Sequence, residues 1–154
     1  MNRAKTDPVD FEIKEIGSKE TYSVRHPVLR KGQPLASCAF DGDDLKTTIH
    51  LGIFDSKKLV GVATLLKNNN PDFKAPIQYQ LRGMAILESH QKKGLGNQLL
   101  AYAEALLVSK QIGFIWCNAR EIATNFYKNN GFSISGEPFD IPIIGTHFKM
   151  YKWL

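Results

Sequence analysis

A glycine loop between a predicted strand and a predicted helix constrains this chain more than any other stretch. Residues 81–87 have the composition of a strand, and the loop Gln91-Lys92-Lys93-Gly94-Leu95-Gly96 follows after a short polar turn. Two glycines let the backbone turn tightly and leave its N–H groups uncovered. The next helix directs its unpaired N–H groups and its positive dipole end at the same point. With two adjacent lysines, this arrangement predicts a site for a phosphate or pyrophosphate.

The length and composition favour one globular domain over residues 1–154. Hydrophobic residues make up 43% and charged residues 23%, as in ordinary soluble proteins. No apolar run approaches the roughly 20 residues of a membrane span. Residues 1–10, which we expect to be flexible, lack the apolar core of a secretory signal. We therefore expect a cytoplasmic protein with no membrane partner.

Cysteine spacing and charge narrow the classes of partner. Cys38 and Cys117 form no Cys-x-x-Cys pair, so we expect no metal site and no disulfide framework. The formal net charge of +5 suits either a polyanionic partner or a solvated surface. Lysines and arginines are scattered, and no predicted helix carries a basic stripe, so we do not expect a nucleic-acid partner. A small polyphosphate needs only the local charge of Lys92 and Lys93.

Hydrophobic periodicity predicts strands before, between and after the helices. The expected strands are 11–16, 47–54, 59–66, 77–87, 114–117, 132–135 and 147–153, with a hairpin turn at 55–58. Helices are expected within 18–29, from 95 to about 110, and over 121–129, and loops over 31–44 and 136–145. Pro27 should kink or end the first helix, and Gly113 should take the left-handed position after the second. Asn118 and Glu121 have the spacing of a capping box, and Ile122 is expected to be buried. The pattern predicts a single mixed α/β domain.

Two common phosphate-binding motifs do not match. A P-loop needs Gly-x-x-x-x-Gly-Lys followed by Ser or Thr, and the chain has none. A dinucleotide fingerprint would continue from Gly94 and Gly96 to a third glycine, but position 99 is Leu.

A third pattern fits better. Gln-x-x-Gly-x-Gly over 91–96 and Phe126-Tyr127-x-x-x-Gly131-Phe132 occur in order, with strand and helix patterns between them. This arrangement resembles the GNAT superfamily of acetyl-CoA-dependent N-acetyltransferases over about residues 77–135. Residues 139–150 also look like the C-terminal end of an uncharacterised ElaA-like branch. The resemblance implies an α/β (α+β) fold with a mixed, twisted central sheet of six to seven strands and about four helices.

The resemblance also implies a site for acetyl-CoA, without a metal. Its pyrophosphate would be held mainly by backbone N–H groups of Gln91, Lys92, Lys93, Gly94, Leu95, Gly96 and Asn97. The strand with Met84, Ala85 and Ile86 would pair with the pantetheine arm, and one of its N–H groups would polarise the thioester carbonyl. Many relatives have Asn where this chain has Arg120, and Asn118 is the replacement candidate for that contact.

Tyr127 matches the residue that protonates the leaving thiolate in many members of the family. Phenol and thiol pKa values differ by only about 1.5 units, so a positioned phenol can supply that proton. The ordinary alternative is a half-buried tyrosine on an amphipathic helix.

The general base and the acceptor are less constrained. Glu88 is the candidate base, beside His50, His147 and the acidic cluster Asp41, Asp43 and Asp44. Glu88 and the cluster could equally be solvated turns, and His50 a structural histidine. We expect transfer to a small-molecule or peptide amine by direct attack in a ternary complex. The alternatives are a silent acyl-CoA-binding sensor and, less favoured, a basic nucleic-acid-binding domain; pairing of a C-terminal edge strand leaves a homodimer open.

Overall fold

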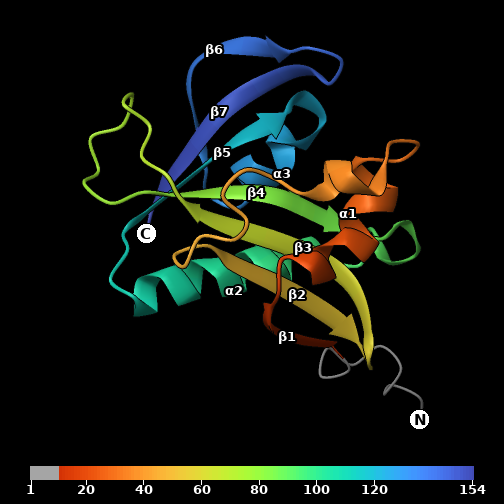
Figure 1. Cartoon of the computed structure of the whole chain (residues 1–154). Coiled ribbons are helices and arrows are strands. Elements are labelled where there is room, and N and C mark those ends of the chain that lie inside the picture. Colours follow the sequence, from red (N-terminus) through yellow and green to blue (C-terminus); the bar gives the residue numbers. More distant parts are fainter. Residues whose placement is uncertain (1–10) are drawn as a thin grey trace. The chain divides into compact units, whose positions relative to one another are not determined.

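The computed structural model describes residues 11–154, and the expectation for residues 1–10 lies outside them. One seven-stranded mixed sheet has the order β1-β2-β3-β4-β5-β7-β6 (Figure 1). Its strands are β1 (Phe11–Ile16), β2 (Ile49–Asp55), β3 (Lys58–Lys67), β4 (Tyr79–Ile86), β5 (Phe114–Arg120), β6 (Ser133–Ile141) and β7 (Gly145–Trp153). The described residues form three α-helices, α1 (Tyr22–Leu29), α2 (Leu95–Ser109) and α3 (Thr124–Asn129), where about four helices were expected. Short 3-10 segments are η3 (Lys19–Thr21), η4 (Leu35–Cys38), η5 (Glu88–His90) and η6 (Glu121–Ala123). The predicted fold class is confirmed.

The chain forms two compact units. The first comprises the described residues up to Leu66 together with Gly83–Ala103, and the second comprises Lys67–Arg82 and Glu104–Leu154. The boundary therefore runs through β4 and through α2. The assignment of residues 1–154 to one domain stays a prediction.

The first unit is built on the antiparallel strands β1, β2 and β3. Asp55 pairs with Lys58 across the β2–β3 turn, which confirms the predicted hairpin, and Ser56 has φ 58° as such a tight turn requires. Helix α1 packs its Val24 against Val62 of β3 and Ala85 of β4. The helix ends two residues beyond Pro27, at Leu29, in accord with the expected effect of that proline.

The second unit contains β5, β6, β7, α3 and parts of β4 and α2. β4 and β5 are parallel, with Tyr79 opposite Ile115 and Gln80 opposite Trp116, and both strands extend beyond these pairs. β7 lies between β5 and β6 and is antiparallel to both. An aromatic cluster of Phe73, Phe114, Trp116 and Tyr151 packs with Ala75.

The predicted loop at 136–145 is wrong, because β6 runs on to Ile141. Its register shifts between Ser135 and Phe139, so the stretch with Pro138 forms an irregularity inside the strand. A proline cannot donate to a strand ladder, but a bulge leaves a residue that needs no partner. The tight turn into β7 places Ile143 at φ 74°.

The ends of two helices also differ from the prediction. Asn118 does not cap a helix, since it lies in β5 and pairs with Lys149 of β7. Arg120 directly precedes η6, and its side chain makes no capping hydrogen bond. Ile122 is 91% exposed, because the first turn after β5 is 3-10 and faces it outward. After α2, Gln111 rather than Gly113 takes the left-handed position, at φ 63°. The Ile112 N–H then donates to the Leu107 carbonyl at 2.9 Å, as in a Schellman ending.

Replacing Gln111 by glycine should stabilise the protein. A side chain at φ 63° crowds its own carbonyl at a cost of about 1 kcal/mol, which glycine avoids. We expect Gln111→Gly to raise the free energy of unfolding in urea by about 0.5 kcal/mol. Gln111→Ala keeps the Cβ and serves as the control, with no gain expected. A Gly variant no more stable than the Ala variant would contradict this account of the helix end.

Candidate functional site

The glycine loop forms an exposed turn at the start of α2. Lys92 and Gly94 have φ 64° and 81°, and residues 91–94 are exposed. The Gly94 carbonyl accepts the first helical bond from the Gln98 N–H at 3.1 Å, so Gly94 is the N-cap. Leu95, next in the chain, is 1% exposed and anchors the helix in the core. The first-turn N–H groups therefore begin directly at an exposed, positively charged loop.

Two side-chain contacts hold the loop from its upstream side. The Gln91 amide donates to the Ile86 carbonyl at 2.9 Å, which ties the loop to the end of β4. His90 Nε2 lies 2.8 Å from an Asp55 carboxylate oxygen, and its Nδ1 lies 2.7 Å from the Ser89 hydroxyl. These contacts fasten η5 to the β2–β3 turn. The position of the loop is thus set by side chains as well as by glycine.

Strand β4 has an unusual backbone immediately before the predicted thioester-binding residues. Gly83 has φ +59° in the middle of the strand, a conformation that side chains disfavour. Met84 and Ile86 are half-buried, and Ala85 is buried. Directly after β4, the Leu87 N–H donates to the Val60 carbonyl of β3 at 2.8 Å.

Tyr127 lies on α3 and is 7% exposed. Its ring packs edge-on against Phe126 and Phe132, with centroids 5.0 Å and 5.3 Å away. Burial, with a smaller contribution from Cys117, raises the pKa of Tyr127 well above its ordinary value. The phenol is therefore protonated at neutral pH, which is the form that can donate a proton.

The other predicted residues occupy different surroundings. Glu88 opens η5 and is exposed, and Asn97, in the first turn of α2, is exposed as well. Asn118 is exposed on β5. The first unit brings together Met84–Ile86, Glu88 and the glycine loop, whereas Asn118 and Tyr127 belong to the second unit.

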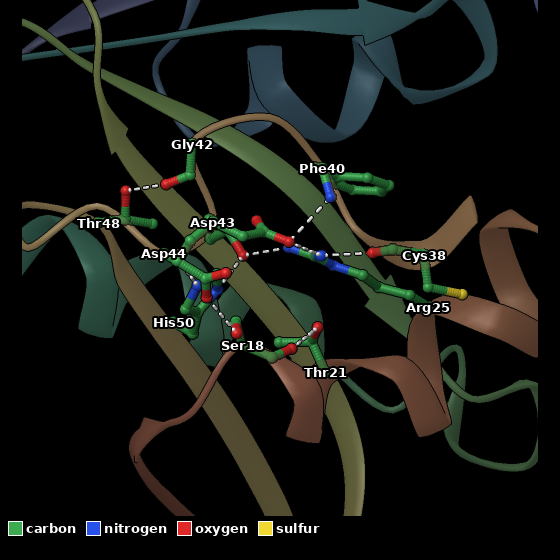
Figure 2. Close-up of polar contacts among 11 residues, drawn as sticks. Ser18, Thr21, Arg25, Cys38, Phe40, Gly42, Asp43, Asp44, Thr48 and His50 are labelled. Atoms are coloured by element: carbon green, nitrogen blue, oxygen red, sulfur yellow. Dashed lines mark hydrogen bonds and ion pairs between the residues drawn. The ribbon is translucent and has the colours of Figure 1, made fainter. Parts of the chain in front are cut away.

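Asp43, one of the base candidates, belongs to a buried polar network (Figure 2). Its carboxylate accepts bonds from Arg25 Nη1 at 2.6 Å and Nη2 at 3.1 Å, and from the Phe40 N–H at 2.9 Å. Burial raises the pKa of the Asp43 carboxyl, but the bonds from Arg25 and Phe40, with the charges of Arg25 and His50, hold it below its ordinary value. The interpretation of Asp43 as part of a solvated turn is therefore wrong, because both of its carboxylate oxygens accept hydrogen bonds inside the protein.

The two histidine candidates also have internal partners. His50 lies in the same network, with Nδ1 2.8 Å from the Thr64 hydroxyl and Nε2 2.8 Å from the Asp43 carbonyl. It therefore has the structural role that was weighed for it. His147 is buried on β7, and its Nδ1 lies 2.8 Å from the Gly145 carbonyl.

Sequence reasoning missed Arg25, the centre of this network. Its side chain is fully buried, although arginine on a surface helix normally reaches solvent. The local sequence carries no sign of this, because the partners Cys38, Asp43 and Thr64 come from a distant loop and from β3.

Within the part of the chain that the structure describes, no three side chains of His, Cys, Asp or Glu are grouped as ligands for a metal ion. None of the helices between residues 11 and 154 is long and apolar enough to cross a membrane.

The chain is similar to known proteins in both sequence and structure. The model of the acetyltransferase (GNAT) family matches residues 14–132. The uncharacterized N-acetyltransferase YitI of Bacillus subtilis is 37% identical over 144 residues, which span 94% of this chain and 97% of that protein. Escherichia coli ElaA has a TM-score of 0.72 and 18% identity, over 92% of this chain and 99% of that one. An aminoglycoside 6′-N-acetyltransferase complexed with coenzyme A has a TM-score of 0.73 and 15% identity, over 92% and 96%. The last two share the fold.

The Asp43 ion pair should make stability depend on pH in one direction. A carboxyl with a lowered pKa in the folded state stabilises the protein above its unfolded pKa, near 3.8, and loses that effect as the pH falls further. Breaking a buried pair costs about 3 kcal/mol, so Asp43→Asn should be less stable by about that amount at pH 7. In urea titrations the difference from the unchanged protein should shrink as the pH falls below about 4. A difference that stays constant over that range would refute the charged pair.

Proposed function

This chain belongs to the acetyltransferase (GNAT) family, and on that premise we propose that it transfers an acetyl group from acetyl-CoA to an amine by direct attack in a ternary complex. One observation carries the proposal: the exposed glycine loop caps a helix whose first residue, Leu95, is locked in the core. Such a helix start offers several aligned N–H groups to an anion without any further rearrangement.

The donor site would extend from the loop to β4. Backbone N–H groups within residues 92–97 would bind the pyrophosphate, with Lys92 and Lys93 adding charge; the Gln91 N–H, predicted to take part, donates to the Glu88 carbonyl at 3.3 Å instead. Met84, Ala85 and Ile86 would pair with the pantetheine arm, since β4 is kinked at Gly83 just before them. Asn118 would contact the same arm. A solved relative of this fold is itself complexed with coenzyme A, which supports a donor of that class.

The chemistry needs three proton movements. The ammonium form of the acceptor gives one proton to the base, and the free amine nitrogen attacks the thioester carbonyl carbon while a β4 N–H stabilises the oxygen that becomes negative. The carbon–sulfur bond then breaks, the departing thiolate takes a proton from the Tyr127 hydroxyl, and the second proton lost by the new amide nitrogen restores the phenol. Glu88, exposed at the end of β4, is the proposed acceptor of the amine proton. Tyr127 carries the proton for this step; because burial raises its pKa above that of a free phenol, the transfer requires the thiolate to form within hydrogen-bond reach of the hydroxyl.

The cysteines favour direct attack over an acyl-enzyme. Both Cys38 and Cys117 are buried, and burial raises the pKa of Cys117. A cysteine nucleophile must reach the thiolate form and contact its substrate, so neither residue is suited to carry the acetyl group. The acceptor would be a small-molecule or peptide amine, and the proposed location is the cytoplasm.

Substitution of Gly94 tests the donor site. Gly94 has φ 81° and open space where a side chain would stand, as does Gly136 at φ 75° in β6. A leucine at either position therefore strains the backbone equally, but only Gly94→Leu covers the loop N–H groups. In calorimetric titrations we expect Gly94→Leu to weaken acetyl-CoA binding by about tenfold or more, and Gly136→Leu to leave it unchanged. Absence of acetyl-CoA binding by the unchanged protein would contradict the donor assignment. An equal loss of affinity in both variants would show that the glycine loop is not the binding site.

Substitution of Tyr127 tests the acid. Tyr127→Phe keeps the ring but removes the proton donor, and general acids typically contribute about 100-fold or more to a rate. We expect amine-dependent release of the CoA thiol to slow by about that factor, with acetyl-CoA affinity unchanged. Tyr102→Phe, at an exposed position of α2, is the matched control. Unaltered turnover in Tyr127→Phe would remove its catalytic role, and binding without any turnover would favour the sensor function instead.

A further inference from the structure

Arg25 is a fully buried charge whose bonds converge from three elements. Its Nη1 donates to the Cys38 carbonyl at 2.8 Å and to Asp43, and its Nη2 donates to Asp43 and to the Thr64 hydroxyl at 2.8 Å. Figure 2 shows the guanidinium reaching from α1 toward the loop that precedes β2. The ion pair is internally neutral, and a buried pair of this kind is weak support for a purely stabilising role, because apolar residues often stabilise as well.

The guanidinium lies directly against the kink of β4. A side chain at Gly83 would place its Cβ 3.4 Å from Arg25 Nε and 3.7 Å from Nη2. The same Cβ would lie 3.1 Å from Cε2 of Phe40, whose ring centre is 4.0 Å from Arg25 Cζ. Arg25 Nε has no hydrogen-bond partner among residues 11–154, so this edge of the guanidinium packs rather than bonds. Arg25 and Phe40 thus fill the space beside Gly83.

The neighbouring residue of α1 contacts the strand just beyond the kink. Val24 packs with Val62 of β3 and with Ala85 of β4. Two consecutive residues of α1 therefore contact β4: Arg25 beside Gly83 and Val24 against Ala85. Because φ +59° sets the direction of the peptides that follow, these contacts fix where the N–H groups of residues 84–86 point.

We propose that Arg25, held in place by Asp43, is a positioning residue that maintains the left-handed turn at Gly83 and so aims the β4 N–H groups at the acyl carbonyl. This rests on the proposed function, which assigns those N–H groups to the thioester. Arg25 acts on the acyl end of the donor only. The glycine loop has two supports that do not involve β4, Leu95 in the core and His90 on Asp55, so we expect its anion site to persist without Arg25.

The test compares Arg25→Met, which keeps the bulk but removes all bonds to Asp43, with Arg25→Lys, which keeps one charge. Lys152→Met is the matched control, since it breaks the part-buried pair between Lys152 of β7 and Glu104 of α2. All measurements are made at temperatures where circular dichroism shows each variant folded. If Arg25→Met does not fold, Arg25→Lys carries the comparison.

The first readout needs no ligand. Amide hydrogen exchange should speed up by about tenfold or more at residues 83–86 in Arg25→Met, and less in Arg25→Lys, as the turn loosens. Exchange at residues 94–98 should stay as in the unchanged protein, and Lys152→Met should alter neither segment. Unchanged exchange at 83–86 in a folded Arg25 variant overturns the proposal.

The second readout uses acetyl-CoA labelled with carbon-13 at its carbonyl. An N–H aimed at the thioester oxygen lowers the C=O stretching frequency, and we expect that shift in the infrared spectrum of the bound donor. Arg25→Met should return the frequency toward that of free acetyl-CoA while the dissociation constant changes less than about threefold. A bound frequency in Arg25→Met equal to that in the unchanged protein overturns the proposal. Failure of the unchanged protein to bind acetyl-CoA overturns the proposed function instead. In that case the hydrogen-exchange experiment still tests whether Arg25 maintains the turn at Gly83.

Discussion

The turn at the start of α2 is the constraint on which the proposed donor site depends. A helix start binds an anion through its first N–H groups and its positive dipole end. The chain shapes this turn with left-handed residues at Lys92 and Gly94 and with a helix whose first residue is buried. The contacts of Gln91 with β4 and of His90 with Asp55 then hold the upstream turn. Rigidity of this kind lowers the entropy lost when a ligand binds.

Two buried polar groups show how the fold supports chemistry without free charges in its interior. Arg25 and Asp43 neutralise each other, and their remaining bonds reach Cys38, Phe40 and Thr64. Tyr127 is uncharged, because a phenol is protonated at neutral pH and burial raises its pKa further. A buried group that is neutral or paired costs far less than an isolated ion, and each of these lies where a defined geometry is useful. In the proposed reaction, one group aims the backbone donors and the other supplies a proton.

Features encoded by local periodicity could be predicted, and features created by distant contacts could not. The β2–β3 hairpin and α2 follow from alternation and helical spacing, and their predicted positions agree with the structure. The extension of β6 past Pro138 was missed because pairing with β7 overrides the local turn signal. The spacing of Asn118 and Glu121 predicts a helix cap, but in the structure the backbone of Asn118 belongs to β5 and pairs with β7. The site divides in the same way: the glycine loop is visible in the sequence, whereas the burial of Arg25 depends on residues that only the fold brings to it.

The most direct test of the central claim is an initial-rate study in which acetyl-CoA and an acceptor amine are varied together. Amines from a broad panel are screened first by release of the CoA thiol. Direct attack in a ternary complex predicts double-reciprocal lines that intersect, with one acetylated amine formed for each thiol released. Parallel lines would indicate an acetylated enzyme intermediate and would contradict the account, because neither buried cysteine could then be dismissed as the carrier.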